Sequence, residues 1–209
     1  MKKIYTIAAA FLIMGTAANA QDFSFDAGYL FSTLSEYDNG SKSYSEASNG
    51  AFAGASCNFT ISEGLGVAPG LYYSFLTNRT VSTPVQTAKF SEHALNLPVF
   101  LNYTLEFGHA DLYFYAGPTF QCGLSSKYRY VETSQERGAE NIVAVADNYQ
   151  DMDMSRFNVF LGGGVGTVLN EKIRVTIGYD QGLLNLYLNE KSKLRDYRSN
   201  VKLTLAYLF

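Results

Sequence analysis

Apolar and polar residues alternate along most of the chain, which is the period of a β-strand with one apolar face. In the last nine residues every second side chain is apolar: Val201, Leu203, Leu205, Tyr207 and Phe209. Seven earlier segments repeat this pattern. The eight predicted strands cover residues 23–34, 51–61, 66–78, 94–107, 111–124, 156–169, 173–184 and 201–209.

The connections between these segments alternate between long and short. Long polar stretches follow the first, third, fifth and seventh segments, at residues 35–50, 78–90, 125–155 and 185–196. Short turns follow the other segments, as at Asn170–Lys172. An up-and-down antiparallel sheet would collect all long connections at one end, as in outer-membrane barrels with long external loops and short periplasmic turns.

The polar face of the segments distinguishes two closed structures. A soluble calyx shows this face to water, whereas a membrane barrel turns it inward and presents its apolar face to lipid. Glycine and small polar residues dominate the face, where a solvated surface would carry more lysine and glutamate. The sequence therefore predicts an all-β fold, an eight-stranded antiparallel up-and-down transmembrane β-barrel, with outer-membrane lipid as its surrounding partner.

A small group of charges also falls on the polar face, and we expect it to form a network in the lumen. Its members are Asp26, Glu106, Arg174, Asp180, Arg198 and Lys202. These residues either line a path for ions and small solutes or close the lumen as a salt-bridged plug. Eight strands leave an interior only wide enough for side chains, which favours the plug.

Prolines and cysteines fall inside the predicted strands. Proline removes a ladder donor, so we expect a bulge beside Pro69 and Pro118 and a bulge or kink at Pro98. Cys57 and Cys122 fall on the lipid face of the second and fifth strands. Because those strands are not neighbours in a meander, we expect two thiols in an apolar setting and no disulfide between them.

The first twenty residues differ from the rest of the chain. Two lysines precede a short apolar run that leads to the small residues of Ala18–Ala20. This is the pattern of a secretory signal peptide, and the run is too short for a spanning helix. We predict a signal peptide at residues 1–20, cleavage between Ala20 and Gln21, and one outer-membrane β-barrel domain at residues 21–209.

Composition excludes two classes of protein, and few residues are candidates for a catalytic or metal site. The mean hydropathy of -0.06 is too polar for a helical membrane protein, and the formal net charge of -3 gives no sign of nucleic-acid binding. Ser91, Glu92 and His93 could serve a lipid-modifying enzyme, but adjacent strand residues point to opposite faces. The aspartates of residues 147–153 lack the glycine and terminal glutamate of a calcium loop. We predict no catalytic, metal or cofactor site.

Four segments of the second half resemble a known family. They read LNLPVFLNYTLEF, LYFYAGPTFQCGL, FLGGGVGTVLNEKIRVTIGYDQGLLNL and RSNVKLTLAYLF. With their proline inside a strand, their Ala-Gly-Pro motif and their glycine-rich sixth strand, they are similar to the PorT-like outer-membrane β-barrel domain proteins of Bacteroidetes-type bacteria, over Ala94–Phe209. The resemblance implies an eight-stranded barrel in a Gram-negative cell outer membrane and no particular substrate.

The final strand also resembles the ending of outer-membrane barrels that the barrel-assembly machinery recognises. The residues that fit this signal are Val201, Leu203, Leu205, Tyr207 and Phe209. The first hypothesis is a non-enzymatic integral outer-membrane protein with a structural or surface-interaction role through its external loops, whose ligand the sequence does not identify. The alternatives are a small-solute channel and, third, a lipid A-modifying enzyme.

Overall fold

The computed structural model describes residues 21–81, 86–107, 110–133, 140–189 and 192–209. The predicted signal peptide, including Ala20 of its cleavage site, lies outside these residues, and Gln21 begins the first strand. Among the residues that the structure describes, no helix is long and apolar enough to cross a membrane.

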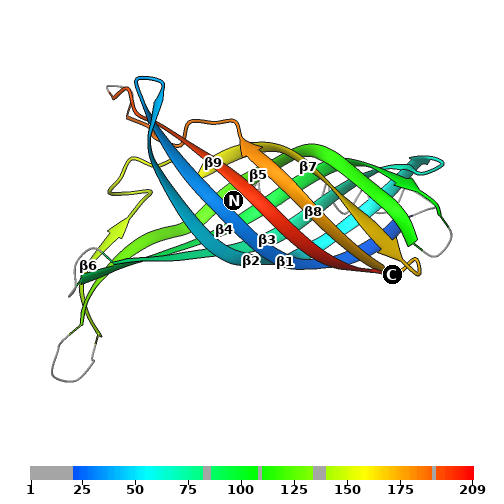
Figure 1. The fold of residues 1–209 in the computed structure, drawn as a ribbon, viewed down its shortest axis with the longest axis horizontal. Coiled ribbons are helices and arrows are strands. Elements are labelled where there is room, and N and C mark those ends of the chain that lie inside the picture. The colour runs from blue at the N-terminus through cyan, green and yellow to red at the C-terminus, as the bar shows by residue number, and fades with distance from the viewer. Residues whose placement is uncertain (1–20, 82–85, 108–109, 134–139, 190–191) are drawn as a thin grey trace, which may run out of the picture.

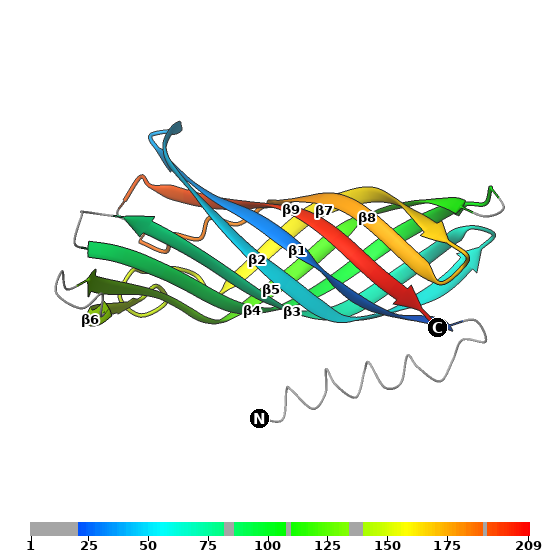
Figure 2. The same ribbon diagram turned by 60° about the horizontal axis from the view of Figure 1, so that its bottom comes forward.

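Nine antiparallel strands make up one sheet, and eight of them close into a ring (Figures 1 and 2). Each ring strand pairs with the next along the chain, except that β5 pairs with β7 and that β9 returns to pair with β1. The strands are β1 (Gln21–Asp38), β2 (Ser41–Ser62), β3 (Leu65–Val81), β4 (Gln86–Leu105), β5 (Ala110–Thr133), β6 (Glu140–Asp147), β7 (Phe157–Leu169), β8 (Ile173–Gly182) and β9 (Arg195–Leu208). The predicted eight-stranded up-and-down barrel is therefore confirmed.

The alternation of the sequence sets which side chains point inward. On β1 the side chains of Asp26 and Leu30 are buried, whereas Phe25 and Tyr29 are 54% and 51% exposed. The same division holds along β9 and at Phe209, where every second residue lies on the outer face, whereas Ala206 is buried and Leu208 packs against an inner cluster. The exposed fractions of the outer residues are Val201 40%, Leu203 53%, Leu205 58%, Tyr207 47% and Phe209 78%. Apolar side chains thus cover the outside of the ring, where lipid replaces water.

Three of the four expected long loops are in fact mostly strand. The stretch at residues 35–50 belongs to the β1–β2 hairpin, and β3 and β4 likewise extend far into residues 78–90. In the third stretch β5 continues and β6 pairs back on its outer end, outside the ring (Figure 1). Backbone pairing satisfies the same polar groups whatever the side chains are, so a polar sequence does not imply a loop. Among the described residues, the connection between β8 and β9 is largely irregular, as are residues 148–156 between β6 and β7.

A two-residue turn joins β1 to β2. Asn39 and Gly40 both have positive φ angles, 50° and 84°, as a tight hairpin turn of type I′ requires. The Asn-Gly pair is a strong hairpin signal, and it lies in the middle of the stretch that we expected to be a loop.

The prolines do not produce the expected bulges. The register is the same on both sides of Pro69, Pro98 and Pro118. Instead the ladder is interrupted, as between the pairs Pro98↔Thr119 and Leu101↔Ala116. A missing N–H group removes a hydrogen bond but inserts no extra residue, so the pairing resumes in phase. The ring of Pro98 lines the lumen.

The two cysteines lie on β2 and β5 and form no disulfide with each other, as we expected. The side chain of Cys122 is exposed on the outer wall, and that of Cys57 is partly buried.

The β1–β2 turn gives a first test of the fold. Replacing Gly40 with valine forces a β-branched residue to a φ of 84°, which costs about 1–2 kcal/mol. We expect faster hydrogen–deuterium exchange of residues 36–45, with exchange of residues 23–31 unchanged, by mass spectrometry of the folded barrel. Ser41→Val, a matched change within the strand, should not speed exchange. Equal protection of the hairpin in wild type and in the Gly40 variant would contradict the turn assignment.

Candidate functional site

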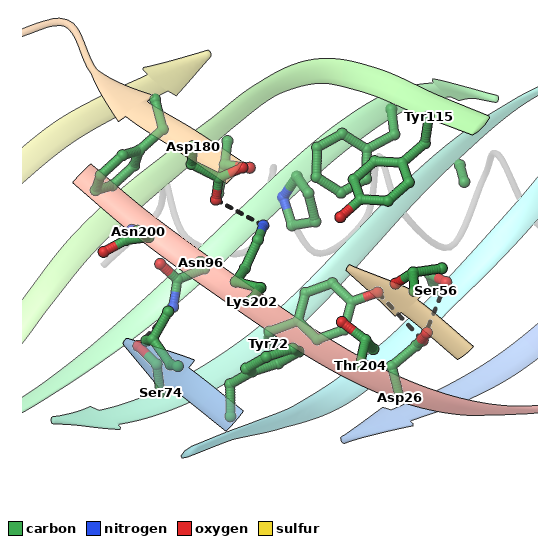
Figure 3. A pocket seen from close by; sticks show the side chains of 18 of the residues that line it. Asp26, Ser56, Tyr72, Ser74, Asn96, Tyr115, Asp180, Asn200, Lys202 and Thr204 are labelled. Carbon is green, nitrogen blue, oxygen red and sulfur yellow. Dashed lines mark hydrogen bonds and ion pairs between the residues drawn. The ribbon is translucent and has the colours of Figure 1, made fainter. Parts of the chain in front are cut away.

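Three ion pairs lie in the lumen at successive levels, and the first lies toward the short-turn end. Arg174 Nη2 of β8 donates to Asp26 Oδ1 of β1 at 2.8 Å. The other carboxylate oxygen of Asp26 accepts from Ser24 at 2.8 Å. It also accepts from Ser56 and Tyr72, at 3.2 and 3.1 Å (Figure 3). Because the carboxylate is 2% exposed, these donors replace the hydration that it loses on burial.

The second ion pair lies near the middle of the barrel. Lys202 Nζ of β9 lies 2.6 Å from Asp180 Oδ2 of β8 and 5.3 Å from the centre of the Phe100 ring (Figure 3). At the first level the Arg174 guanidinium likewise lies 4.7 Å from the centre of the Tyr113 ring. Aromatic faces attract cations in desolvated sites. Arg174 and Lys202 therefore each contact a carboxylate and a ring.

A cavity of about 80 Å³ lies between these two pairs. Polar side chains line much of it, and three lining atoms have no hydrogen-bond partner among the described residues: Thr119 Oγ1, Asp180 Oδ1 and Asn200 Oδ1. A polar cavity of this size holds a few water molecules, which can satisfy such atoms. The cavity is therefore a polar compartment of the lumen that suits water.

The third pair closes the lumen toward the long-hairpin end. Both guanidinium amino groups of Arg198 (β9) donate to the carboxylate of Glu92 (β4), Nη2 to Oε2 at 3.0 Å. The two side chains are 6% and 4% exposed, and Ser126 also donates to Glu92 at 3.2 Å. A paired guanidinium and carboxylate in this two-bond geometry hold a fixed orientation. The pair therefore links β4 to β9 across the barrel in a fixed geometry.

Apolar side chains beside the Glu92–Arg198 pair also fill the lumen at this level. Leu30, Leu76 and Phe90 form a buried cluster with Phe52 and Tyr128 packed against it. Leu30 and Phe52 line the 80 Å³ cavity, whereas Leu76, Phe90, Tyr128 and Arg198 line a smaller one of about 30 Å³ on the outer side. The cluster thus separates the two compartments.

The structure places five of the six predicted lumen charges in these ion pairs, but not Glu106. Glu106 follows the last residue of β4 and is exposed, so its inclusion in the lumen network was wrong. Strand β4 ends at Leu105, two residues earlier than expected, and leaves Glu106 at the turn. Glu92 is a lumen charge that we did not predict. Its side chain faces inward, as do those of Ala88 and Phe90 at every second position before it on β4. The in-phase spacing of Glu92 with Asn96 and Asn102 was the signal that could have found it.

The other candidate residues lie apart from one another. Glu92 points into the lumen, whereas the side chain of His93 lies on the outer wall between Tyr73 and Phe75, with ring centres 6.0 and 4.9 Å away. The aspartates of residues 147–153 cap a turn, because Asp147 accepts from the backbone N–H of Tyr149 at 3.0 Å. In the described part of the chain, no group of three or more His, Cys, Asp or Glu residues could hold a metal ion.

The outer ion pair predicts a large effect of a small substitution. Glu92→Gln leaves the buried Arg198 guanidinium without its counter-charge, which costs about 3–5 kcal/mol. We expect the folded barrel to convert to its unfolded gel mobility at a clearly lower temperature. Glu106→Gln removes the same charge from an exposed turn and should not change that temperature. Equal midpoints for both variants would contradict the role of the pair.

Comparison with known proteins places the chain among outer-membrane barrels. A family model described as outer membrane protein beta-barrel domain matches residues 17–188. A comparison with curated protein sequences finds no match.

Several solved structures have a similar fold. Ail, the attachment invasion locus protein of Yersinia pestis, solved in complex with the heparin analogue sucrose octasulfate, is 13% identical, with 90% of this chain and 99% of that chain covered and a TM-score of 0.49. Neisserial surface protein A is 10% identical, with 90% and 97% covered and a TM-score of 0.47. OprG from Pseudomonas aeruginosa is 12% identical, with 92% and 97% covered and a TM-score of 0.45. Because the family model matches most of the chain, this protein belongs to the outer membrane protein beta-barrel domain family and is a multi-pass β-barrel of the cell outer membrane.

Proposed function

We propose that this barrel is a non-enzymatic outer-membrane protein that acts through its external hairpins, in surface interaction or in the structure of the envelope. The observation that carries the proposal is the closed lumen. The Glu92–Arg198 pair and the cluster around Leu30 leave cavities of about 80 and 30 Å³ on either side. Because side chains fill the interior, the parts that can meet other molecules are the wall and the outer hairpins.

The β1–β2 hairpin is the most prominent of these parts. From Phe31, the last apolar outward residue of β1, to the turn at Asn39, the strand rises about 26 Å along its own direction at ~3.3 Å per residue. Figure 1 shows this hairpin standing away from the ring. Its outer half carries aromatic side chains, among them Tyr44, which is 56% exposed, and Tyr37, whose ring lies 6.0 Å from that of Tyr197. Exposed tyrosines suit protein and glycan contacts because they give large contact area with few rotatable bonds.

The two alternatives have weaker support. A small-solute channel draws support from the polar cavity, but the outer ion pair would have to open for a solute to pass. A lipid A-modifying enzyme would need Ser91 and His93 to act with an acid, and Glu92 points to the opposite face, toward Arg198.

Three finer assignments belong to the same proposal. The resemblance of Ala94–Phe209 to PorT-like proteins supports that subgroup, and the composition of residues 1–20 supports export by a signal peptide cut before Gln21. The outward aromatic end of β9, including Tyr207 and Phe209, supports recognition by the barrel-assembly machinery.

A trimmed hairpin tests the proposed function. Deleting residues 35–38 and 41–45 leaves the Asn39–Gly40 turn between Leu34 and Glu46, which are already cross-strand partners. We expect the trimmed protein to reach the outer membrane at the wild-type level but to lose the cell–cell or cell–surface attachment that wild type restores to a deletion strain. Neither protein should give conductance steps in a planar bilayer. Steps from wild type would favour the channel, and full attachment by the trimmed protein would remove the hairpin from the function.

The rim of the barrel should also respond to pH. Glu36 of β1 lies directly opposite Asp196 of β9, and burial together with the Glu36 carboxylate raises the pKa of Asp196. The folded rim therefore binds a proton more tightly than the unfolded chain, so its stability is highest below the ordinary aspartate pKa and falls as pH rises through the raised value.

We expect Asp196→Asn to slow amide exchange at Tyr37 and Tyr197 at pH 7. The difference from wild type should disappear near pH ~3, where the carboxyl is protonated in both states. Faster exchange in the variant at pH 7 would contradict the like-charge contact.

A further inference from the structure

The lumen compartment of about 80 Å³ has more hydrogen-bond acceptors on its wall than the protein itself satisfies. Among the described residues, three oxygen atoms on this wall have no hydrogen-bond partner: Thr119 Oγ1, Asp180 Oδ1 and Asn200 Oδ1. All three side chains are more than nine-tenths buried. Burial of an acceptor without a donor costs free energy, most of all for a carboxylate. The wall therefore suits a molecule that brings N–H or O–H groups into the compartment.

The two carboxylates of the compartment differ in how completely they are bonded. Asp26 Oδ1 accepts from Arg174, and Asp26 Oδ2 accepts from three hydroxyl groups. At Asp180, by contrast, Lys202 contacts Oδ2, and Oδ1 has no partner among the described residues. The fold thus supplies donors to both oxygen atoms of one lumen carboxylate and to one oxygen atom of the other.

Two glycines place the unpartnered oxygen atoms on the same side of the barrel. The register aligns Gly117 of β5, Gly162 of β7 and Asp180 of β8 in one row. A Cβ atom at Gly162 would overlap Asp180 Oδ1, so this oxygen lies where a side chain would otherwise be. Asn200 of β9 continues the row beside Asp180 (Figure 3), and Thr119 is the next inward residue of β5. The three oxygen atoms therefore face the compartment from β5, β8 and β9.

The charges around the compartment limit the kind of molecule that fits. Arg174 balances Asp26, and Lys202 balances Asp180. An ion would add an unpaired charge to this narrow interior, which is unfavourable. The Lys202 ammonium carries N–H donors beyond the one that its ion pair uses, so an acceptor on the ligand can bond to it. A neutral molecule with several donors and one acceptor satisfies both requirements.

Size and wall chemistry narrow the class further. At the ~30 Å³ that a water molecule occupies in the liquid, 80 Å³ holds about three waters or one molecule of about four non-hydrogen atoms. Phe100, Tyr115 and Phe160 add aromatic surface to the wall, against which a flat molecule packs. Urea is flat, has about this size, and carries N–H donors on both sides of one carbonyl oxygen. A diol of the same size offers fewer donors.

From the unpartnered oxygen atoms, the balanced charges and the size of the compartment, we infer that the lumen binds a small neutral amide of the urea type. Its N–H groups donate to Thr119, Asp180 and Asn200, and its carbonyl oxygen accepts from Lys202. One such molecule replaces several ordered waters and keeps their hydrogen bonds, so the release of those waters favours binding. The site is independent of the proposed surface role of the hairpins.

Solution NMR of the isotope-labelled barrel in detergent micelles tests the inference. Three probes of similar flat shape are added below the concentrations that unfold the protein: urea, acetone, which keeps the carbonyl oxygen but has no N–H group, and guanidinium, which adds a positive charge. The readout is the backbone amide shift at residues 119, 180 and 200. Thr119→Val removes one acceptor at nearly constant volume, and Thr167→Val makes the same change on the outer face of β7, between the exposed Val165 and Leu169.

We expect urea to shift these amides saturably in wild type and in the Thr167 variant, and acetone and guanidinium to shift them little. Thr119→Val should weaken urea binding about fivefold through the loss of one hydrogen bond. Without urea this variant should be at least as stable as wild type, because an unpartnered hydroxyl is gone. Equal urea binding by the two variants, an equal response to acetone or guanidinium, or urea shifts that do not saturate would overturn the inference.

Discussion

Closure of the ring between β1 and β9 is the constraint on which the rest of the structure depends. Inside a bilayer each backbone polar group must find a partner within the protein, and the β1–β9 pairing from Ser24↔Leu208 to Tyr37↔Arg195 removes the last open edge. Eight strands make the closed ring narrow. The interior is consequently narrow and rich in polar residues, so charges in matched pairs and tyrosines fill it, and glycines make room for them.

Glycine decides where the large side chains can lie. A Cβ atom added at Gly178 would come within 2.1 Å of the Tyr115 hydroxyl, and one at Gly28 within 2.7 Å of the Phe52 ring. The glycines of β7 and β8 thus leave the space that the aromatic residues pointing inward from β2, β4 and β5 occupy. Carboxylates and bases take the remaining space, where each is buried together with its partner and with hydroxyl or amide donors. The interior is specific because shape and charge must both be satisfied across strands far apart in sequence.

The alternation of the sequence was enough to predict the ring, its orientation toward lipid and the inward positions of Asp26, Arg174 and Lys202, because period two acts residue by residue. It did not predict how far the strands extend. Polar hairpin arms such as Ser41–Glu46 have no apolar face. They pair through backbone hydrogen bonds, which do not depend on the pattern of apolar and polar side chains. The Asn39–Gly40 turn was the sequence feature that could have predicted this hairpin. Ion-pair partners were also beyond reach, since choosing Glu92 rather than Glu106 for Arg198 needs the tilt of the strands as well as their phase.

In two of the three lumen pairs the partners are remote along the chain, and this bears on the order of folding. Asp26 and Arg174 are 148 residues apart, and Glu92 and Arg198 are 106 apart, whereas β1 and β2 meet through a two-residue turn. Local hairpins form quickly, and contacts between distant segments come late because their loop-closure entropy is large. The lumen charges therefore stay hydrated while the hairpins assemble, and they lose that water only as the last strands meet. Desolvation and pairing of these charges then coincide in one cooperative event. The ion pairs therefore contribute little to the stability of a half-closed sheet and contribute fully only in the closed barrel.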